Sequence, residues 1–179
     1  MQAKRRTSLN LAARKRISVC AFVVFLVDNF SKSVALHYLP GHPVRVLGEF
    51  LQLDLRFNSG AAFSIGTSKT IIFSGFALIA LSFGFYFSRN VTNMWWALAL
   101  GLAMGGILGN LSDRIFRPPG ALQGQVVDWI AIAHWPTFNL ADSSIVVAAI
   151  LIVFLSARNI KPIAPDEPTN TERTDGSGH

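Results

Sequence analysis

The feature that most constrains this chain is a pair of long runs without a charged residue. The first extends from Thr70 to Ser88 and the second from Asn90 to Ser112. A helix needs about 20 mainly apolar residues to cross the hydrocarbon core of a bilayer. Only 15% of the residues are charged, against roughly 25% in a typical soluble domain. We therefore predict a membrane protein with one helix in each run.

Two further apolar segments are imperfect membrane spans. Residues Ile17 to Leu36 contain Asp28 and Lys32, and the run Ser143 to Ala157 is long enough only if its helix begins near Asn139. The first span could instead be a cleaved signal peptide ending at Ser33-Val34-Ala35. Such peptides rarely carry an acid and a lysine between the apolar core and the cleavage site, so we favour four retained membrane helices.

Lysine and arginine beside the helix ends indicate the orientation, because the cytoplasmic side of a membrane protein holds the excess. Six of the sixteen basic residues lie in the first sixteen positions, so we expect both termini to be cytoplasmic. Because no basic stripe runs through the rest of the chain, we expect no nucleic-acid partner. We divide the chain into a basic N-terminus (1–16), a transmembrane domain (17–157) and a cytoplasmic tail (158–179), which we expect to be disordered from Pro162.

The loop after the first helix contains a strict alternation of apolar and polar residues. Leu51, Leu53, Leu55 and Phe57 alternate with polar neighbours, a period of two that is typical of a strand. An isolated strand pair is marginally stable in water. We therefore expect this strand to rest on the membrane surface or against the helix ends.

With this topology, the polar residues embedded in apolar sequence gather at the extracytoplasmic face. Asp28 and Lys32 are spaced for a helical ion pair, which either lets the helix tolerate both charges, with the lysine reaching the headgroups, or positions substrate. Asn110 and Asp113 share one helical face after a glycine-rich run suited to close helix packing. Asp113 could also simply end its helix, and the segment from Asn58 to Phe63 is either a simple loop or a backbone that approaches a ligand.

Asp128 and Asp142 are the most informative acids. Asp128 lies in an apolar segment of the second outer loop, and Asp142 lies at the start of the fourth span, where it could serve only as a helix cap. Two facing carboxylates in a poorly solvated place share a proton, which supplies one base and one acid. Such a pair activates water for attack on an amide. The lone Cys20 excludes a disulfide framework and multi-cysteine metal sites, and we expect neither a metal nor a cofactor.

Five ordered blocks give the chain a resemblance to a known family, the bacterial lipoprotein signal peptidases (signal peptidase II). The blocks are Asp28-Asn29-Phe30-Ser31-Lys32, Asn58 to Ser64, Gly105 to Arg114, Val126-Val127-Asp128, and Phe138 to Ser143. The resemblance implies four membrane helices with a small extracytoplasmic β-sheet cradle in the bacterial inner membrane. It also implies an aspartyl peptidase that cleaves diacylglyceryl-modified prolipoproteins on the N-terminal side of the lipidated cysteine.

Matched by motif, the resemblance implies that Asp128 and Asp142 form the catalytic pair. It implies that seven residues shape the site or bind substrate: Asn58, Gly60, Asn110, Asp113, Arg114, Asn139 and Ala141. Asp28 and Lys32 fall on the family's first-helix motif, and we assign them to structure or positioning. We expect the partners to be lipidated prolipoproteins and membrane lipids, and the protein to be a monomer.

Two other functions fit a membrane protein with intramembrane acids. A proton- or ion-coupled carrier would use acids as a relay, but a relay needs them spread across the bilayer, and the inner half of these spans has none. A non-catalytic scaffold gives no reason to gather costly acids at one face. The sequence therefore favours the peptidase.

Overall fold

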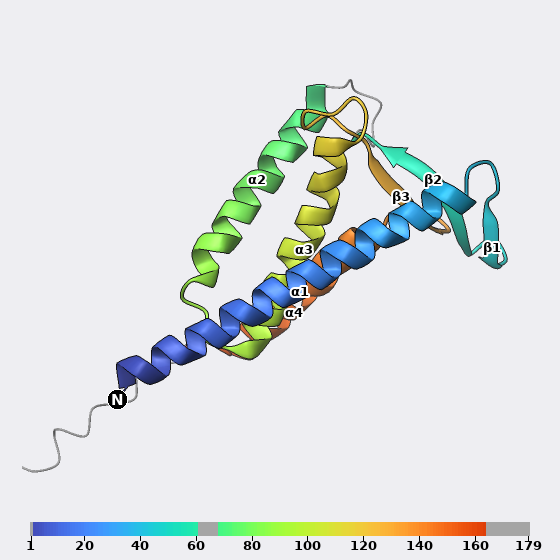
Figure 1. The fold of residues 1–179 in the computed structure, drawn as a ribbon. Coiled ribbons are helices and arrows are strands. Elements are labelled where there is room, and N and C mark those ends of the chain that lie inside the picture. The colour runs from blue at the N-terminus through green and yellow to red at the C-terminus, as the bar shows by residue number, and fades with distance from the viewer. Residues whose placement is uncertain (1, 61–67, 164–179) are drawn as a thin grey trace, which may run out of the picture.

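A computed structural model of the chain, described here for residues 2–60 and 68–163, consists of four helices and one small sheet (Figure 1). The helices are α1 (Gln2–Tyr38), α2 (Ser68–Ser88), α3 (Met94–Phe116) and α4 (Leu140–Ala157). The strands are β1 (Val44–Leu47), β2 (Leu51–Asn58) and β3 (Val126–Ile132). All four helices are long and apolar enough to cross a membrane, which confirms the four predicted spans.

Helix α1 is longer than the predicted span. It begins at Gln2 rather than Ile17 and continues to Tyr38, so the basic N-terminal segment belongs to the same helix as the span. The first proline and glycine of the chain are Pro40 and Gly41, and nothing earlier breaks the helical backbone. The boundary that we drew at residue 17 therefore does not coincide with a structural boundary.

Helix α3 lies between α1 and α4 and also packs against α2. Its glycines permit this close approach. A Cβ atom on Gly109 would lie 2.5 Å from Oδ2 of Asp28 in α1, and one on Gly106 would collide with Ser144 and the backbone of Ala141 in α4. The prediction that the glycine-rich run of α3 packs closely against neighbouring helices is thus confirmed.

The outer surfaces of the helices are apolar and exposed in the isolated chain. Phe83 on α2 is 67% exposed, and Val153 on α4 is also 67% exposed. Such a surface would be unfavourable in water. A contiguous exposed apolar surface is typical of contact with lipid or with another protein. The helices therefore present these side chains to the bilayer.

The sheet is antiparallel, with strand order β1-β2-β3, and lies at the C-terminal end of α1 (Figure 1). Strand β2 matches the predicted alternating segment, but Leu51 to Leu55 are all half-buried and Phe57 is 53% exposed. The alternation of apolar and polar residues in β2 therefore does not separate a buried face from a solvent-exposed face. The exposed apolar residues of the hairpin suit contact with the membrane surface.

Strand β3 was not predicted from its sequence, which we interpreted only as an apolar part of the second outer loop. It pairs with β2 so that Asp128 lies opposite Arg56 and Val126 lies opposite Asn58. Its first three residues are buried, so it lacks the alternation of a half-buried strand. The pairing places Asp128 in a fixed position at the helix ends.

The C-terminal segment is ordered slightly further than predicted. Helix α4 ends at Ala157, but the carbonyl of Pro162 accepts hydrogen bonds from the backbone N–H groups of Thr92 and Asn93, at 3.0 and 3.1 Å. The carbonyl of Ile160 accepts one from the Trp96 indole at 2.7 Å. The prediction of disorder from Pro162 onward is therefore wrong at Pro162 itself. The tail from residue 164 lies outside the described residues.

Candidate active site

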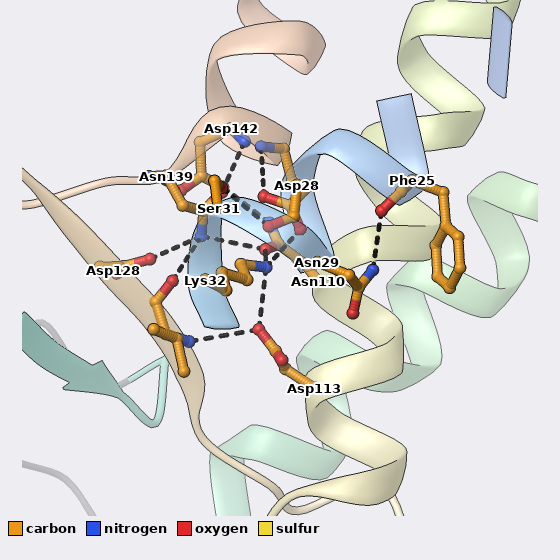
Figure 2. Close-up of polar contacts among 12 residues, drawn as sticks. Phe25, Asp28, Asn29, Ser31, Lys32, Asn110, Asp113, Asp128, Asn139 and Asp142 are labelled. Carbon is orange, nitrogen blue, oxygen red and sulfur yellow. Dashed lines mark hydrogen bonds and ion pairs between the residues drawn. The ribbon is translucent and has the colours of Figure 1, made fainter. Parts of the chain in front are cut away.

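Polar side chains from α1, α3, β3 and the start of α4 meet at the sheet end of the bundle (Figure 2), and Asn58 at the end of β2 joins them through Asp128. Ten of the eleven residues singled out in the sequence belong to one network of hydrogen bonds and ion pairs: Asp28, Lys32, Asn58, Gly60, Asn110, Asp113, Asp128, Asn139, Ala141 and Asp142. The five sequence blocks therefore converge at one place, although they are spread over more than a hundred residues.

Asp128 is held by two side-chain amides. Its Oδ2 accepts a hydrogen bond from Nδ2 of Asn58 at 2.9 Å, and its Oδ1 accepts one from Nδ2 of Asn139 at 2.7 Å. Backbone groups orient both amides, because Oδ1 of Asn58 accepts from Gly60 N–H and Oδ1 of Asn139 accepts from Asp142 N–H. Each amide must therefore present its donor to the Asp128 carboxylate.

The environment of Asp128 favours its protonated form. The side chain is almost fully buried, and this desolvation is the largest cause that raises its pKa from 3.8 to about 6. Repulsion from the nearby Asp142 also raises the pKa, whereas the hydrogen bonds from Asn58 and Asn139 oppose the shift. The pKa of Asp128 is therefore set mainly by burial, with Asp142 acting in the same direction.

Asp142 lies in the first turn of α4. Its Oδ1 accepts a hydrogen bond from Nδ2 of Asn110 at 2.7 Å, and its Oδ2 accepts one from the backbone N–H of Asn139 at 3.2 Å. Asn139 is the N-cap, and Asp142 completes the capping box from position N3. The alternative that Asp142 is itself the N-cap is thus wrong. An anion here interacts favourably with the positive end of the helix dipole.

Lys32 is fully buried at the centre of the network. Its ammonium group lies 2.7 Å from Oδ2 of Asp28 and 2.8 Å from Oδ2 of Asp113, and it donates to Oδ1 of Asn110 at 3.0 Å (Figure 2). The ammonium group is therefore enclosed by three oxygen atoms, two of which belong to carboxylates. The predicted ion pair with Asp28 is present, but Lys32 does not extend to the headgroups, because two anions hold it inside the protein.

Asp28 and Asp113 connect Lys32 to the two candidate catalytic segments. Oδ1 of Asp28 accepts a hydrogen bond from the backbone N–H of Ala141, at 2.9 Å, and Oδ2 of Asp113 accepts one from that of Val127, at 3.2 Å. Each N–H belongs to the residue just before a candidate catalytic aspartate. The alternative that Asp113 merely ends its helix is wrong, because α3 continues to Phe116.

Gly60 and Arg114 both lie next to Phe73. Gly60 has a positive φ of 82°, and a Cβ there would lie 2.6 Å from the Phe73 ring. The Arg114 guanidinium lies 5.8 Å from the centre of the same ring, and its Nη1 is buried without a hydrogen-bond partner. Arg114 thus has a donor available beside the carboxylates. The rest of the Asn58 block, residues 61–64, lies outside the described residues.

Three residues near the site were missed in the sequence. Arg117 pairs with Asp113 through its Nε atom. On α2, Thr70 donates to the carbonyl of Ser59 and Ser74 donates to that of Leu122, both at 2.6 Å. The spacing of Thr70 and Ser74, four apart in an apolar run, was the available signal, because hydroxyl groups in membrane helices often form such bonds.

No three His, Cys, Asp or Glu side chains in residues 2–60 and 68–163 are arranged to hold a metal ion. The described acids of the helices and of β3 are Asp28, Asp113, Asp128 and Asp142, and all belong to the same network. They do not form the series across the bilayer that a carrier would need. The fold and the site define a four-helix membrane protein with a cluster of four carboxylates at one end of its bundle.

Comparison with known proteins places this architecture in a peptidase family. Residues 20–158 match the family model described as signal peptidase II, and the chain belongs to that family. It is 45% identical over 137 residues to a lipoprotein signal peptidase of Mycobacterium tuberculosis strain H37Rv, covering 76% of this chain and 68% of the relative. A Rhodococcus jostii protein of the same name is 43% identical over 150 residues, covering 83% and 76% of the two chains.

A solved structure has the same fold as this chain. It is described as a bacterial membrane enzyme determined by the in meso method at 1.9 Å resolution. The match has a TM-score of 0.70 and 30% sequence identity, and it covers 79% of this chain and 92% of that chain. The resemblance inferred from five sequence blocks is therefore confirmed for the family and for the fold, and the protein is a membrane peptidase.

Proposed function

We propose that this protein removes the signal peptide from diacylglyceryl-modified prolipoproteins by cutting on the N-terminal side of the lipidated cysteine, with Asp128 and Asp142 as the catalytic pair. The observation that carries the proposal is the convergence of these two carboxylates, from a strand and a helix, on one amide-lined centre. The relatives named lipoprotein signal peptidase support the substrate class. A substrate with acyl chains reaches such a site by diffusing within the bilayer.

In the proposed reaction, ionised Asp142 removes a proton from water, and the resulting hydroxide attacks the scissile carbonyl carbon. Protonated Asp128 donates a hydrogen bond to the carbonyl oxygen, and its proton then passes to the leaving amine as the C–N bond breaks. The raised pKa of Asp128 supports its role as the proton carrier. The position of Asp142 in the first helical turn, where an anion is stabilised, supports its role as the base.

The amides and the arginine serve this chemistry as binding and orienting groups. Asn58 and Asn139 orient Asp128, and Asn110 orients Asp142. The unpaired Nη1 of Arg114 supplies a donor for a main-chain carbonyl of the substrate. Gly60 leaves room for the ring of Phe73, which supports the Arg114 guanidinium.

Lys32, Asp28 and Asp113 act as positioning residues. Lys32 neutralises both acids, and each acid holds the backbone beside one catalytic aspartate. We call these three residues the clamp. The clamp fixes the separation of β3 and α4, and thus of the two reacting carboxylates. Such support matters because a small misplacement of catalytic groups costs a large factor in rate.

We also propose that both termini are cytoplasmic and that the site faces the extracytoplasmic side. Arg14, Lys15 and Arg16 lie toward the N-terminal end of α1, and Arg158 follows α4 at the end remote from the sheet. The positive-inside rule supports this orientation. A monomer is sufficient for the reaction, since one chain supplies every proposed site residue.

The experiment is cleavage of a synthetic precursor by purified protein in vesicles, with the precursor offered in diacylglyceryl-modified and unmodified form. The wild type should cut only the modified form, and mass spectrometry should find a product that begins with the lipidated cysteine. Asp128→Asn and Asp142→Asn should each lower the rate by about 10³-fold or more. Asp54→Asn is the matched control, because Asp54 forms an ion pair with the exposed Arg56 and is not part of the hydrogen-bonded network of the site.

Two results would reject the proposal in separate ways. Full activity of both site variants would remove the aspartyl mechanism. Equal cleavage of the unmodified precursor would show that the diacylglyceryl group is not required.

A further inference from the structure

A concave surface lies at the end of the bundle opposite the carboxylate site. It is a groove of about 570 Å³ along the seam between α1 and the first turns of α3. Its walls include Lys15, Arg16, Val19, Cys20, Trp95 and Leu98. At its inner end the two helices touch, because a Cβ on Gly101 would lie 2.6 Å from Cβ of Cys20. The catalytic proposal gives this groove no role.

The charge of the groove is entirely positive. Lys15 and Arg16 line it and are exposed, and neither forms an ion pair with a described residue. The sequence contains no acid between residues 1 and 27 or between residues 55 and 112, so neither helix segment can supply one. The positive end of the α3 dipole adds to the same potential. An anion is therefore the favoured occupant of this rim.

The remainder of the groove is apolar. Val19 and Trp95 are each about half exposed, and Leu98 is 37% exposed. Tryptophan prefers the level of the lipid headgroups, where its ring is apolar and its N–H can be solvated. The groove thus combines two exposed cations, an interfacial aromatic ring and an apolar wall.

We propose that this groove is a binding site for an anionic phospholipid of the leaflet that faces the N-terminus. The headgroup phosphate would contact Lys15 and Arg16, and one acyl chain would lie along Val19 and Leu98. Basic pockets between membrane helices on the cytoplasmic side bind anionic headgroups in this way. The proposal does not depend on the peptidase chemistry, since it shares no residue with the carboxylate site.

The charges also discriminate among possible occupants. A signal peptide is basic at its cytoplasmic end, so Lys15 and Arg16 would repel that end. A zwitterionic lipid would fit the apolar wall but would leave the rim without a net negative partner. An anionic lipid satisfies both parts of the groove.

Quenching of tryptophan fluorescence by brominated lipid tests the proposal. The full-length protein is reconstituted in phosphatidylcholine vesicles that contain a small fixed fraction of brominated phosphatidylglycerol or brominated phosphatidylcholine. The difference between wild type and Trp95→Phe isolates the signal at the groove. Each cation beside an anionic lipid contributes a preference of about fivefold, so the wild type should favour phosphatidylglycerol by about tenfold or more, and salt should weaken this preference.

The variant Lys15→Gln/Arg16→Gln should lose most of this preference. Arg89→Gln/Arg158→Gln is the matched control. It removes two cations at the same end, each of which stacks on a phenylalanine of the helix that it follows, and neither is part of the groove. This control should retain the preference. Equal quenching by the two lipids in wild type, or equal loss of preference in both double variants, would overturn the proposal.

Discussion

The two ends of this helix bundle treat charge in opposite ways. At the sheet end, Lys32, Asp28 and Asp113 are buried within the protein and satisfy one another. At the other end, Lys15 and Arg16 remain exposed on the outer surface of the same helix α1. Isolated buried charges are costly in a membrane protein, whereas basic residues at its ends interact with headgroups.

The comparison shows where the fold organises chemistry. At the sheet end, a buried cation pairs with two anions, and each anion accepts a hydrogen bond from the backbone next to Asp128 or Asp142. The opposite end uses apolar packing of Ala13 and Ile17 with Ala97 and Leu100, and it leaves its charges to the solvent and the lipid. A substitution of the same type should therefore have different consequences at the two ends.

The largest expected difference is between two lysines of α1. Lys32→Met leaves Asp28 and Asp113 buried without their shared cation, and breaking a buried ion pair in this way costs about 3–5 kcal/mol. Lys15→Met removes an exposed charge and should change the free energy of unfolding by less than about 0.5 kcal/mol. Denaturation in detergent micelles measures both values.

A neutral version of the clamp sharpens this test. The triple variant Lys32→Met/Asp28→Asn/Asp113→Asn removes all three charges but keeps side-chain oxygens that can accept from Ala141 and Val127. It should recover a large part of the lost stability. If Lys32→Met alone were as stable as the wild type, the buried ion cluster would not support the fold.

A smaller difference is expected between two glycines of α3. A methyl group on Gly109 would lie 2.5 Å from Oδ2 of Asp28, and one on Gly101 would lie 2.6 Å from Cβ of Cys20. Both alanine variants should lose about 1–3 kcal/mol of stability through overpacking. Only Gly109→Ala displaces the clamp, so its kcat should also fall by about 10²-fold. Equal kcat values in the two variants would show that the position of Asp28 does not control catalysis.

The smallest expected effect is a change in pH dependence. If Asp128 must be protonated, kcat/KM should fall as the pH rises above about 6, the value to which its pKa is raised. Asn58→Ala removes a hydrogen bond that favours the charged form, so the pKa should rise and the decline should move up by about one pH unit. Asn93→Ala, which removes the N-cap of α3 at the other end, should weaken the helix but leave the profile unchanged.

The same shift has a consequence for stability. Because the pKa of Asp128 is higher in the folded chain than its ordinary value of 3.8, the fold favours the protonated form. Its contribution to stability is fully present below about pH 3.8 and is lost as the pH rises through about 6. Asp128→Asn should remove this pH dependence from the free energy of unfolding. If the free energy of unfolding of Asp128→Asn still fell over the same pH range, the titrating group would be a residue other than Asp128.

The sequence alone determined the membrane character, the four spans and the family. These features depend on the length of uncharged runs and on residues adjacent in the chain, which can be counted without knowing the fold. It also indicated that Asp128 and Asp142 belong together, through the family resemblance. It did not indicate that Asp128 lies on a strand, because Val126 and Val127 are buried together and break the alternation that marks a half-buried strand.

Only the tertiary structure decided how the site is held. The pairing of β3 with β2 places Asp128 beside Asn58, and the approach of α1 to Gly109 of α3 brings Asp28 to the backbone of Ala141. The burial of Lys32 follows from the same packing, since its two anionic partners come from different helices. Such contacts between distant segments leave no period or spacing in the sequence, because they depend on which helices pack together and at what depth.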